Sequence, residues 1–383
     1  MLNWLKSIWN SLWRVGWPRD ERASVKAMLS SLLLHLHPPK IRPESLKFRA
    51  TWAAGLVSLV LALQLTVTGI YLMFYYIPHP DAAWRSMKDL AFVVPLGTLT
   101  RNAHPWAAHA MVAIVTVHML RVYMASGYKG SRQANWVAGV ALWFLTLALS
   151  FTGYLLPWDQ LAYWAVTVGS NMAAAVPLVG DHFRQLILGD RSVGESALLR
   201  FYVLHCVALP AILFLIVGFH LFRVRKDGGL VVSEHAPGGG RGDEGHKLVP
   251  AWPHLVYREL IVTLVVTATL LALALWLQAP LEAEADPSRT PNPAKAPWYF
   301  LGVQELAHYS AFWGGVFVPA ATLLGLALLP YLDTHAEGVG RYLPKERRIA
   351  QALFAALLLF MAVTTVVGTL FRGPAWALMW WPK

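Results

Sequence analysis

The stretch RNAHPWAAHAMVAIVTVHMLRVY (residues 101–123) contains two histidines, His104 and His118, that lie fourteen positions apart in a mostly apolar run. A second stretch, RFYVLHCVALPAILFLIVGFHLFRVRK (200–226), contains His205 and His220, fifteen positions apart. Because an α-helix has about 3.6 residues per turn and rises about 1.5 Å per residue, each pair would lie roughly on one helix face, at levels about 21 Å apart. Two such helices side by side would form two bis-histidine sites, one above the other.

The composition is typical of a membrane protein: 56% of the residues are hydrophobic, only 14% are charged and 18 are Trp. A helix of about 20 apolar residues crosses the ~30 Å hydrocarbon core of a bilayer. Seven uncharged stretches are long enough, or nearly so: 51–77, 103–120, 136–156, 201–222, 260–281, 311–332 and 349–371. The sequence therefore predicts an all-α integral membrane protein with seven transmembrane helices, the first four of which form a four-helix bundle.

An eighth uncharged stretch, residues 160–180, is not interpreted as a span. Pro157 precedes it, a Gly-Ser-Asn sequence interrupts it at 169–171, and Pro177 follows near its end. Proline and glycine disfavour a continuous helix. We expect two short helices along the membrane surface instead.

Basic residues are unequally divided between the two sides that seven spans define. The segments on the N-terminal side hold 22 of the 32 Lys and Arg residues, and the opposite segments hold 10. Since Lys and Arg favour the cytoplasmic side, we expect a cytoplasmic N-terminus and a periplasmic C-terminus in a bacterial inner membrane. The net charge of +11 is then mainly a topology signal, and its scattered basic residues argue against nucleic-acid binding.

Four segments follow from this pattern. Residues 1–46 form an N-terminal arm with an apolar helical stripe, which favours an amphipathic helix in the membrane interface. Residues 47–226 hold the first four spans, 227–250 form a Gly-rich cytoplasmic linker, and 251–383 hold the last three spans. The stripe consists of Trp4, Leu5, Ile8, Trp9, Leu12 and Trp13.

The two helices that carry the histidine pairs run in the same direction. His104 therefore lies level with His205 near the periplasmic side, and His118 level with His220 near the cytoplasmic side. This arrangement indicates two haems, each held by two imidazoles. A lone intramembrane histidine is usually a packing residue or a proton carrier, and we interpret His109 as a packing residue.

Glycines and arginines support the haem interpretation. A haem between helices needs space, which glycine provides. The first span has Gly55 and Gly69, and the third has Gly139 and Gly153, both pairs fourteen apart. Haem propionates need cations, and four arginines lie near the ends of the histidine helices: Arg101, Arg121, Arg200 and Arg223.

The chain resembles the cytochrome b subunit of quinol-oxidising Rieske/cytochrome b complexes over nearly its full length. The runs LPWDQLAYWAV (156–166) and HLFRVRKDG (220–228) resemble the chloroplast and cyanobacterial branch, and AWPHLVY (251–257) resembles the start of its three-helix subunit IV. In that branch the two parts are separate chains, whereas here one chain contains both. The resemblance implies two haem b groups, a quinol-oxidising pocket on the periplasmic side and a second quinone pocket on the cytoplasmic side.

The resemblance also implies a substrate and partners. The substrate would be a quinol, menaquinol or ubiquinol, and the partners would be a Rieske iron–sulfur protein, cytochrome c-type subunits, or both, in a homodimeric complex. Two other functions remain open: a di-haem anchor that relays electrons between quinone and another dehydrogenase or reductase, and a haem-free proton-coupled transporter.

Two positions depart from the family pattern. The photosynthetic branch attaches an extra haem through a cysteine near the start of the first span, where this chain has Trp52. We expect no covalent haem, and we interpret Cys206 as a small core residue. The family usually has Pro-Glu-Trp-Tyr before its sixth span, with the Glu proposed to accept a quinol proton, but Pro297 stands in its place.

Other residues are candidates for the quinone sites. Glu305, with an expected raised pKa, would take over the proton-accepting role, and Asp159 is the second candidate. Trp298 and Tyr299 would line the quinol pocket, with Tyr299 also a candidate for catalysis. On the cytoplasmic side, two adjacent charged residues open the fifth span and resemble a Lys-Asp pair of the family's quinone-reducing site: Arg258 and Glu259.

Overall fold

The computed structural model describes residues 20–30, 37–227, 248–333 and 340–380. Within these residues, seven helical segments are long and apolar enough to cross a membrane, which confirms the predicted number: Ala54–Met73, Gly97–Met124, Gly130–Leu155, Glu195–Asp227, Ala251–Trp276, Trp313–Leu332 and Lys345–Leu370. The predicted amphipathic helix near the N-terminus and most of the Gly-rich linker lie outside the described residues.

The N-terminal half begins with the arm and ends with the fourth span. Its elements are α2 (Glu21–Ser30), β1 (Lys40–Ile41), η2 (Pro43–Leu46), α3 (Phe48–Thr51), α4 (Ala54–Met73), α5 (Pro80–Phe92), α6 (Gly97–Met124), η3 (Gly130–Arg132), α7 (Gln133–Leu155), α8 (Gln160–Ala174), α9 (Gly180–Leu188), α10 (Glu195–Val203), η4 (Leu204–Ala208) and α11 (Leu209–Asp227). The C-terminal half holds β2 (Val249–Pro250), α12 (Ala251–Trp276), α13 (Trp298–Tyr309), η5 (Trp313–Phe317), α14 (Val318–Leu332), η6 (Lys345–Arg347), α15 (Arg348–Leu370) and η7 (Pro374–Trp376).

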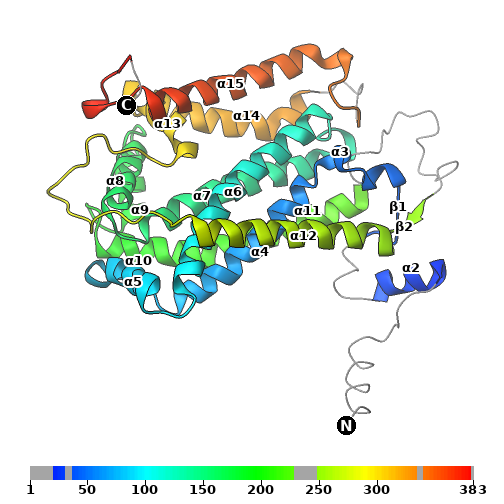
Figure 1. Cartoon of the computed structure of the whole chain (residues 1–383). Coiled ribbons are helices and arrows are strands. Elements are labelled where there is room, and N and C mark those ends of the chain that lie inside the picture. Colours follow the sequence, from blue (N-terminus) through cyan, green and yellow to red (C-terminus); the bar gives the residue numbers. More distant parts are fainter. Residues whose placement is uncertain (1–19, 31–36, 228–247, 334–339, 381–383) are drawn as a thin grey trace, which may run out of the picture.

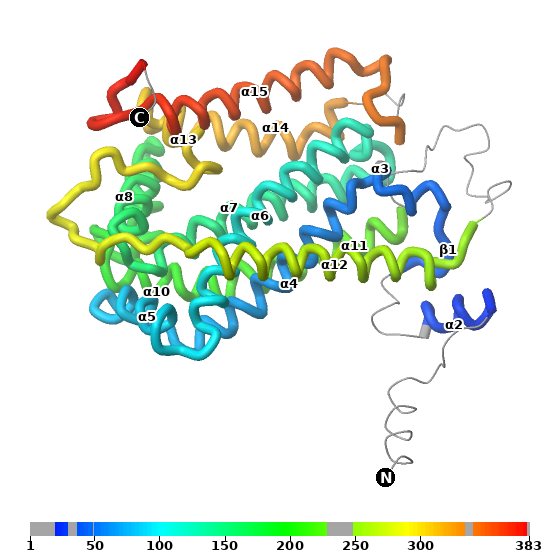
Figure 2. Tube along the Cα trace, in the orientation of Figure 1, coloured from blue at the N-terminus to red at the C-terminus, as the bar shows by residue number. Residues whose placement is uncertain are grey.

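The spans lie side by side with their axes in roughly one direction (Figures 1 and 2). Helices α4, α6, α7 and α11 form the N-terminal bundle, α12 lies along α4 and α6, and α14 and α15 lie on the side of α7. Small residues of α6, Ala103 and Ala107, meet Ala62 of α4 and Ala274 of α12 in one buried cluster. Small side chains let neighbouring helices approach closely where lipid gives no hydrophobic driving force.

The eighth apolar stretch is not among the seven spans of the described residues, but the predicted break at 169–171 was wrong: α8 runs through it to Ala174, and the second short helix, α9, begins only at Gly180. Gly169 serves packing instead, since a Cβ there would lie 2.8 Å from the Phe151 ring.

Helix α8 runs across the direction of the spans (Figure 1). Asp159 ends the preceding loop and caps α8, because its carboxylate accepts the Ala162 backbone N–H at 2.9 Å. These helices close the end of the bundle that carries His104 and His205.

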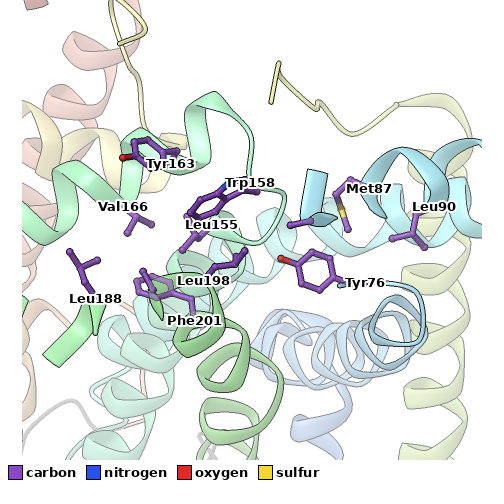
Figure 3. Close-up of a cluster of buried hydrophobic side chains, with 12 residues drawn as sticks. Tyr76, Met87, Leu90, Leu155, Trp158, Tyr163, Val166, Leu188, Leu198 and Phe201 are labelled. Atoms are coloured by element: carbon purple, nitrogen blue, oxygen red, sulfur yellow. The ribbon is translucent and has the colours of Figure 1, made fainter. Parts of the chain in front are cut away.

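A buried apolar cluster holds this end together (Figure 3). It joins Tyr76 and Leu90, next to and within α5, to Trp158 and to Leu198 and Phe201 of α10. Leu90 and Leu198 are fully buried. The short elements therefore form a rigid cover over one end of the bundle.

A polar cluster joins the two halves at the opposite end. Asp333, just after α14, accepts hydrogen bonds from Tyr128 at 2.5 Å and Lys129 at 2.8 Å and forms an ion pair with Arg347. Arg347 also donates to Ser126 at 2.7 Å. The loop after α6 is thus tied directly to the ends of α14 and α15.

Asn102 of α6 links this helix to the C-terminal end of α12. Its side chain is 2% exposed, donates to the Ala274 carbonyl at 3.0 Å and accepts the Ala279 N–H at 2.9 Å. The Ala274 carbonyl belongs to the last turn of α12, where carbonyls have no partner within the helix. One side chain therefore satisfies two backbone groups of the neighbouring segment.

We predict that Asn102→Ala lowers the free energy of unfolding by about 2–4 kcal/mol, because both backbone groups lose their partner. Thermal unfolding of the purified protein in detergent would measure the loss. Thr100→Val is the control, since Thr100 lies on the same helix and donates only to the Leu96 carbonyl of its own turn. Equal unfolding temperatures for the two variants would contradict this role of Asn102.

Candidate functional site

The four predicted histidines form two pairs inside the bundle. The ring centroids of His104 and His205 are 6.1 Å apart with an interplanar angle of 74°, and those of His118 and His220 are 6.4 Å apart at 83°. Helix α6 supplies one ring of each pair, and the continuous segment η4–α11 supplies the other. The two pairs therefore have nearly the same separation at two levels of the bundle.

A π-helical turn explains how a fifteen-residue spacing matches a fourteen-residue one. Residues Leu204–Ala208 form one π-turn between α10 and α11, and His205 lies in it. A π-turn accommodates one extra residue in an α-helix. The extra residue keeps His205 and His220 in the same relative orientation as His104 and His118.

Each predicted glycine faces one imidazole. A Cβ atom added at Gly69 would lie 3.2 Å from His104 Cε1, and one at Gly153 would lie 2.5 Å from His205 Cε1. The same holds at the other pair, where a Cβ at Gly55 would lie 3.2 Å from His118 and one at Gly139 would lie 3.8 Å from His220. At three of the four glycines an added Cβ would lie closer to an imidazole than ordinary van der Waals contact allows, and the contact would be shortest at Gly153.

Threonines fix the ring hydrogens of the His104/His205 pair. Thr68 uses its own hydrogen on the Gln64 carbonyl at 2.8 Å, so its oxygen accepts the His104 Nδ1–H at 2.9 Å. The His205 Nδ1 donates to the Leu149 carbonyl at 3.0 Å and lies 3.3 Å from the Thr152 hydroxyl. Both rings then have a free lone pair on Nε2, the form in which an imidazole binds a metal.

The donor set fits a haem held by two imidazoles. First-row metal ions bind imidazole nitrogens at about 2 Å, and two rings on opposite sides of one metal would have centroids roughly 6 Å apart. The observed separations of 6.1 and 6.4 Å match this arrangement. The glycines leave the adjacent helix surfaces free of side chains, as a flat macrocycle requires.

The arginines contact protein groups near the two pairs. Arg101 donates to the Pro280 carbonyl at 3.1 Å, and Arg200 donates to the Leu186 carbonyl at the end of α9. Arg121 lies over Trp52 and Tyr342, with its guanidinium 5.6 and 4.7 Å from their ring centroids. Trp52 thus packs against the Arg121 guanidinium, and a propionate-binding role for these arginines stays a prediction.

Glu305 differs from its expected state. It is 2% exposed and forms a bidentate ion pair with Arg372, at 2.5 and 2.9 Å, while Trp376 and Tyr309 donate to the same carboxylate. Burial alone would raise the pKa of Glu305, but these hydrogen bonds and the Arg372 charge hold the pKa below its ordinary value of 4.5. The prediction of a raised pKa for Glu305 was wrong, because Arg372, which lies 67 positions later in the sequence, stabilises the ionised carboxylate.

Asp159 shows the opposite shift. It is 8% exposed, and burial raises its pKa above the ordinary 3.8, although backbone N–H groups of Ala162 and Glu282 partly oppose the shift. Glu282 donates its N–H to the other carboxylate oxygen at 3.1 Å. Of the two acids proposed for proton transfer, only Asp159 has a raised pKa.

Trp298 and Tyr299 contact the histidine helix at the His104 end. The Trp298 indole donates to His109 Nδ1 at 3.1 Å, and the Tyr299 ring lies 5.6 Å from the His109 ring. Burial raises the pKa of Tyr299 to about 12, so its hydroxyl stays protonated. His109, predicted to be a packing residue, also accepts this hydrogen bond, which no pattern within its own segment indicated.

Arg258 and Glu259 have separate partners at the other end. Glu259 forms an ion pair with His37 of the N-terminal arm at 3.0 Å, and Arg258 donates to the His254 carbonyl at 2.6 Å. The arm is held nearby by antiparallel pairing of β1 with β2. His37 is a further member of this site that the sequence did not indicate.

Comparisons with known proteins agree with this arrangement. The family model described as cytochrome b/b6/petB matches residues 40–228, and the model described as cytochrome b (C-terminal)/b6/petD matches residues 284–380. Cytochrome b6 of Prochlorococcus marinus (strain MIT 9303) is 37% identical over 209 residues, which cover 55% of this chain and 93% of the relative. Cytochrome b6 of Heliomicrobium gestii is 44% identical over 173 residues, which cover 45% of this chain and 81% of the relative.

A solved structure extends the similarity to the whole chain. A chain of a hyperthermophilic respiratory Complex III superimposes with a TM-score of 0.76 at 26% sequence identity, covering 98% of this chain and 93% of that one. The two family models lie in chain order, the first over the N-terminal half and the second over α13 to the C-terminal segment, and α12 lies between the two matched ranges. The chain belongs to the cytochrome b/b6 family, with a b6-like N-terminal part and a subunit-IV-like C-terminal part in one polypeptide.

Proposed function

We propose that the chain is the di-haem subunit of a membrane quinol oxidoreductase of the cytochrome bc type. Quinol is oxidised at the His104/His205 end, assigned to the periplasmic side by the distribution of basic residues, and electrons pass across the membrane to a second quinone site at the His118/His220 end. The observation that carries the proposal is the pair of bis-imidazole sites, each faced by two glycines.

The histidines are proposed to hold two haem b groups. Bound haem supplies reversible one-electron redox chemistry, and two imidazole ligands leave the iron no open position for oxygen chemistry. The chain orients the rings: Thr68 and the Leu149 carbonyl accept the Nδ1 hydrogens of the His104 pair, which leaves Nε2 for the metal. The apolar bundle excludes water from both sites.

At the quinol end, Trp298, Tyr299 and Asp159 are proposed to form the pocket and its proton exit. Asp159 is the proposed proton acceptor, because burial raises its pKa, whereas the ion pair with Arg372 lowers the pKa of Glu305. Glu305 is assigned a structural role, since its carboxylate is fully used in holding Arg372. At the opposite end, Arg258 and Glu259 are the proposed quinone-site residues.

The partners are proposed on the same basis. A high-potential acceptor is needed for one electron of each quinol, and a Rieske protein, a cytochrome c-type subunit, or both would supply it in a homodimeric complex. The quinone would be menaquinone or ubiquinone, and the membrane a bacterial inner membrane.

The test is quinol-driven reduction of the purified complex, followed by its visible spectrum. A short-chain quinol should reduce the b haems within the turnover time, and reduction of the high-potential acceptor subunit by the other electron of the quinol should accompany it. The proposed function would be contradicted by a complex whose b haems are reduced by dithionite but not by quinol.

We predict that Gly153→Ala and Gly139→Ala have unequal effects. The added Cβ would lie 2.5 Å from His205 Cε1 in the first variant and 3.8 Å from His220 Cε1 in the second. Gly153→Ala should lose most of the haem of the His104/His205 pair, while Gly139→Ala keeps both haems. Haem content and redox titration of the two variants would measure this, and equal haem retention in both would count against the assignment.

We predict that Asp159→Asn slows quinol oxidation and removes the acid limb of its pH profile. Only ionised Asp159 accepts a proton, so the wild-type rate should fall as pH drops through its raised pKa. Glu282→Gln is the matched control, because it removes a neighbouring exposed carboxylate but keeps the backbone N–H that binds Asp159. An unchanged rate and pH profile in Asp159→Asn would exclude this role.

A further inference from the structure

His109 lies on the haem-ligand helix α6, one and a half turns after His104, and contacts three aromatic residues. Its ring is 5.7 Å from that of Trp106 and 5.6 Å from that of Tyr299, and its Nδ1 accepts the Trp298 indole N–H at 3.1 Å. Among the described residues, this is the side-chain hydrogen bond that joins α6 to α13. His109 thus lies where the proposed quinol pocket meets the haem helix.

The indole determines which nitrogen of His109 carries the hydrogen. An indole N–H only donates, so Nδ1 must offer a lone pair. The neutral ring then carries its hydrogen on Nε2. Within the part of the chain that the structure describes, no residue accepts that hydrogen, and the ring is only half-buried.

Neighbouring polar groups are already used. The Trp106 indole donates to the Leu277 carbonyl at 2.9 Å, and the two candidate acids have other partners: Glu305 binds Arg372, and Asp159 binds the backbone of Ala162. No described carboxylate or cation contacts the His109 ring. The His109 N–H is therefore flanked by aromatic rings and can bind an acceptor from outside the chain.

We propose that the His109 Nε2–H binds one oxygen of the quinol head group. This proposal rests on the proposed quinol-oxidising function of the same end. Aromatic rings of Trp106, Trp298 and Tyr299 suit the flat apolar ring of a quinol, and one N–H fixes its orientation. As the quinol loses its proton, the same N–H stabilises the negative charge that develops on the oxygen. Trp298 is a positioning residue, because it holds His109 in the required tautomer.

Two amide substitutions separate this role from a structural one. In His109→Gln, the amide reaches the position of Nε2 and still offers a donor to substrate. In His109→Asn, the amide reaches only the position of Nδ1 and still offers an acceptor to Trp298. We expect His109→Gln to keep KM for a short-chain quinol within about threefold, and His109→Asn to raise it about tenfold, as for one lost hydrogen bond. Haem content and thermal stability should match wild type in both.

The opposite pattern, with His109→Gln impaired and His109→Asn unaffected, would show that His109 serves only Trp298 and would overturn the proposal. Wild-type kinetics in both variants would overturn it equally. Trp298→Phe provides an independent check: it frees the tautomer but keeps the imidazole, so its KM should rise less than that of His109→Asn. If wild-type complex does not oxidise quinol at all, the proposed function fails first and this inference fails with it.

Discussion

The rest of the structure depends on one constraint: each of two histidine pairs must hold its ring centroids about 6 Å apart inside the apolar helix bundle. Helix α6 and the η4–α11 segment meet it only because a π-turn at His205 shifts the register of one helix by a residue. Helices α4 and α7 meet it by presenting glycines where the rings point. A bundle of four ordinary apolar helices would fill this space with side chains.

Several polar groups inside the membrane-spanning part have partners of matching chemistry. A threonine hydroxyl that donates to a carbonyl of its own helix can still accept a hydrogen bond. At Thr68 the hydroxyl oxygen accepts the ring hydrogen of His104. Asn102 likewise both donates and accepts, since it binds the Ala274 carbonyl at the end of α12 and the Ala279 N–H just beyond it. Tyr128 and Lys129 bind Asp333 and so join the two halves at one end. At the other end, Glu305 and Arg372 hold the C-terminal segment against α13.

The seven spans, the two histidine pairs and the facing glycines were predictable because hydropathy and helical spacing act within one segment. The threonines beside the rings were not predicted, although the repeated dipeptides Thr68–Gly69 and Thr152–Gly153 could have indicated them. Contacts between distant segments were not predictable: His109 and Trp298 are 189 positions apart, and Glu305 and Arg372 are 67 apart. The pKa of Glu305 depends on such a partner, so burial alone gave the wrong direction.

The central claim is that each polypeptide holds two non-covalent haem b groups, and the haem-to-protein ratio of the purified chain tests it most directly. A pyridine haemochrome assay against quantitative amino-acid analysis should give two haem b per chain, all extractable with acidic acetone. A ratio of one or zero in folded protein, or haem that remains on the polypeptide after extraction, would contradict the account.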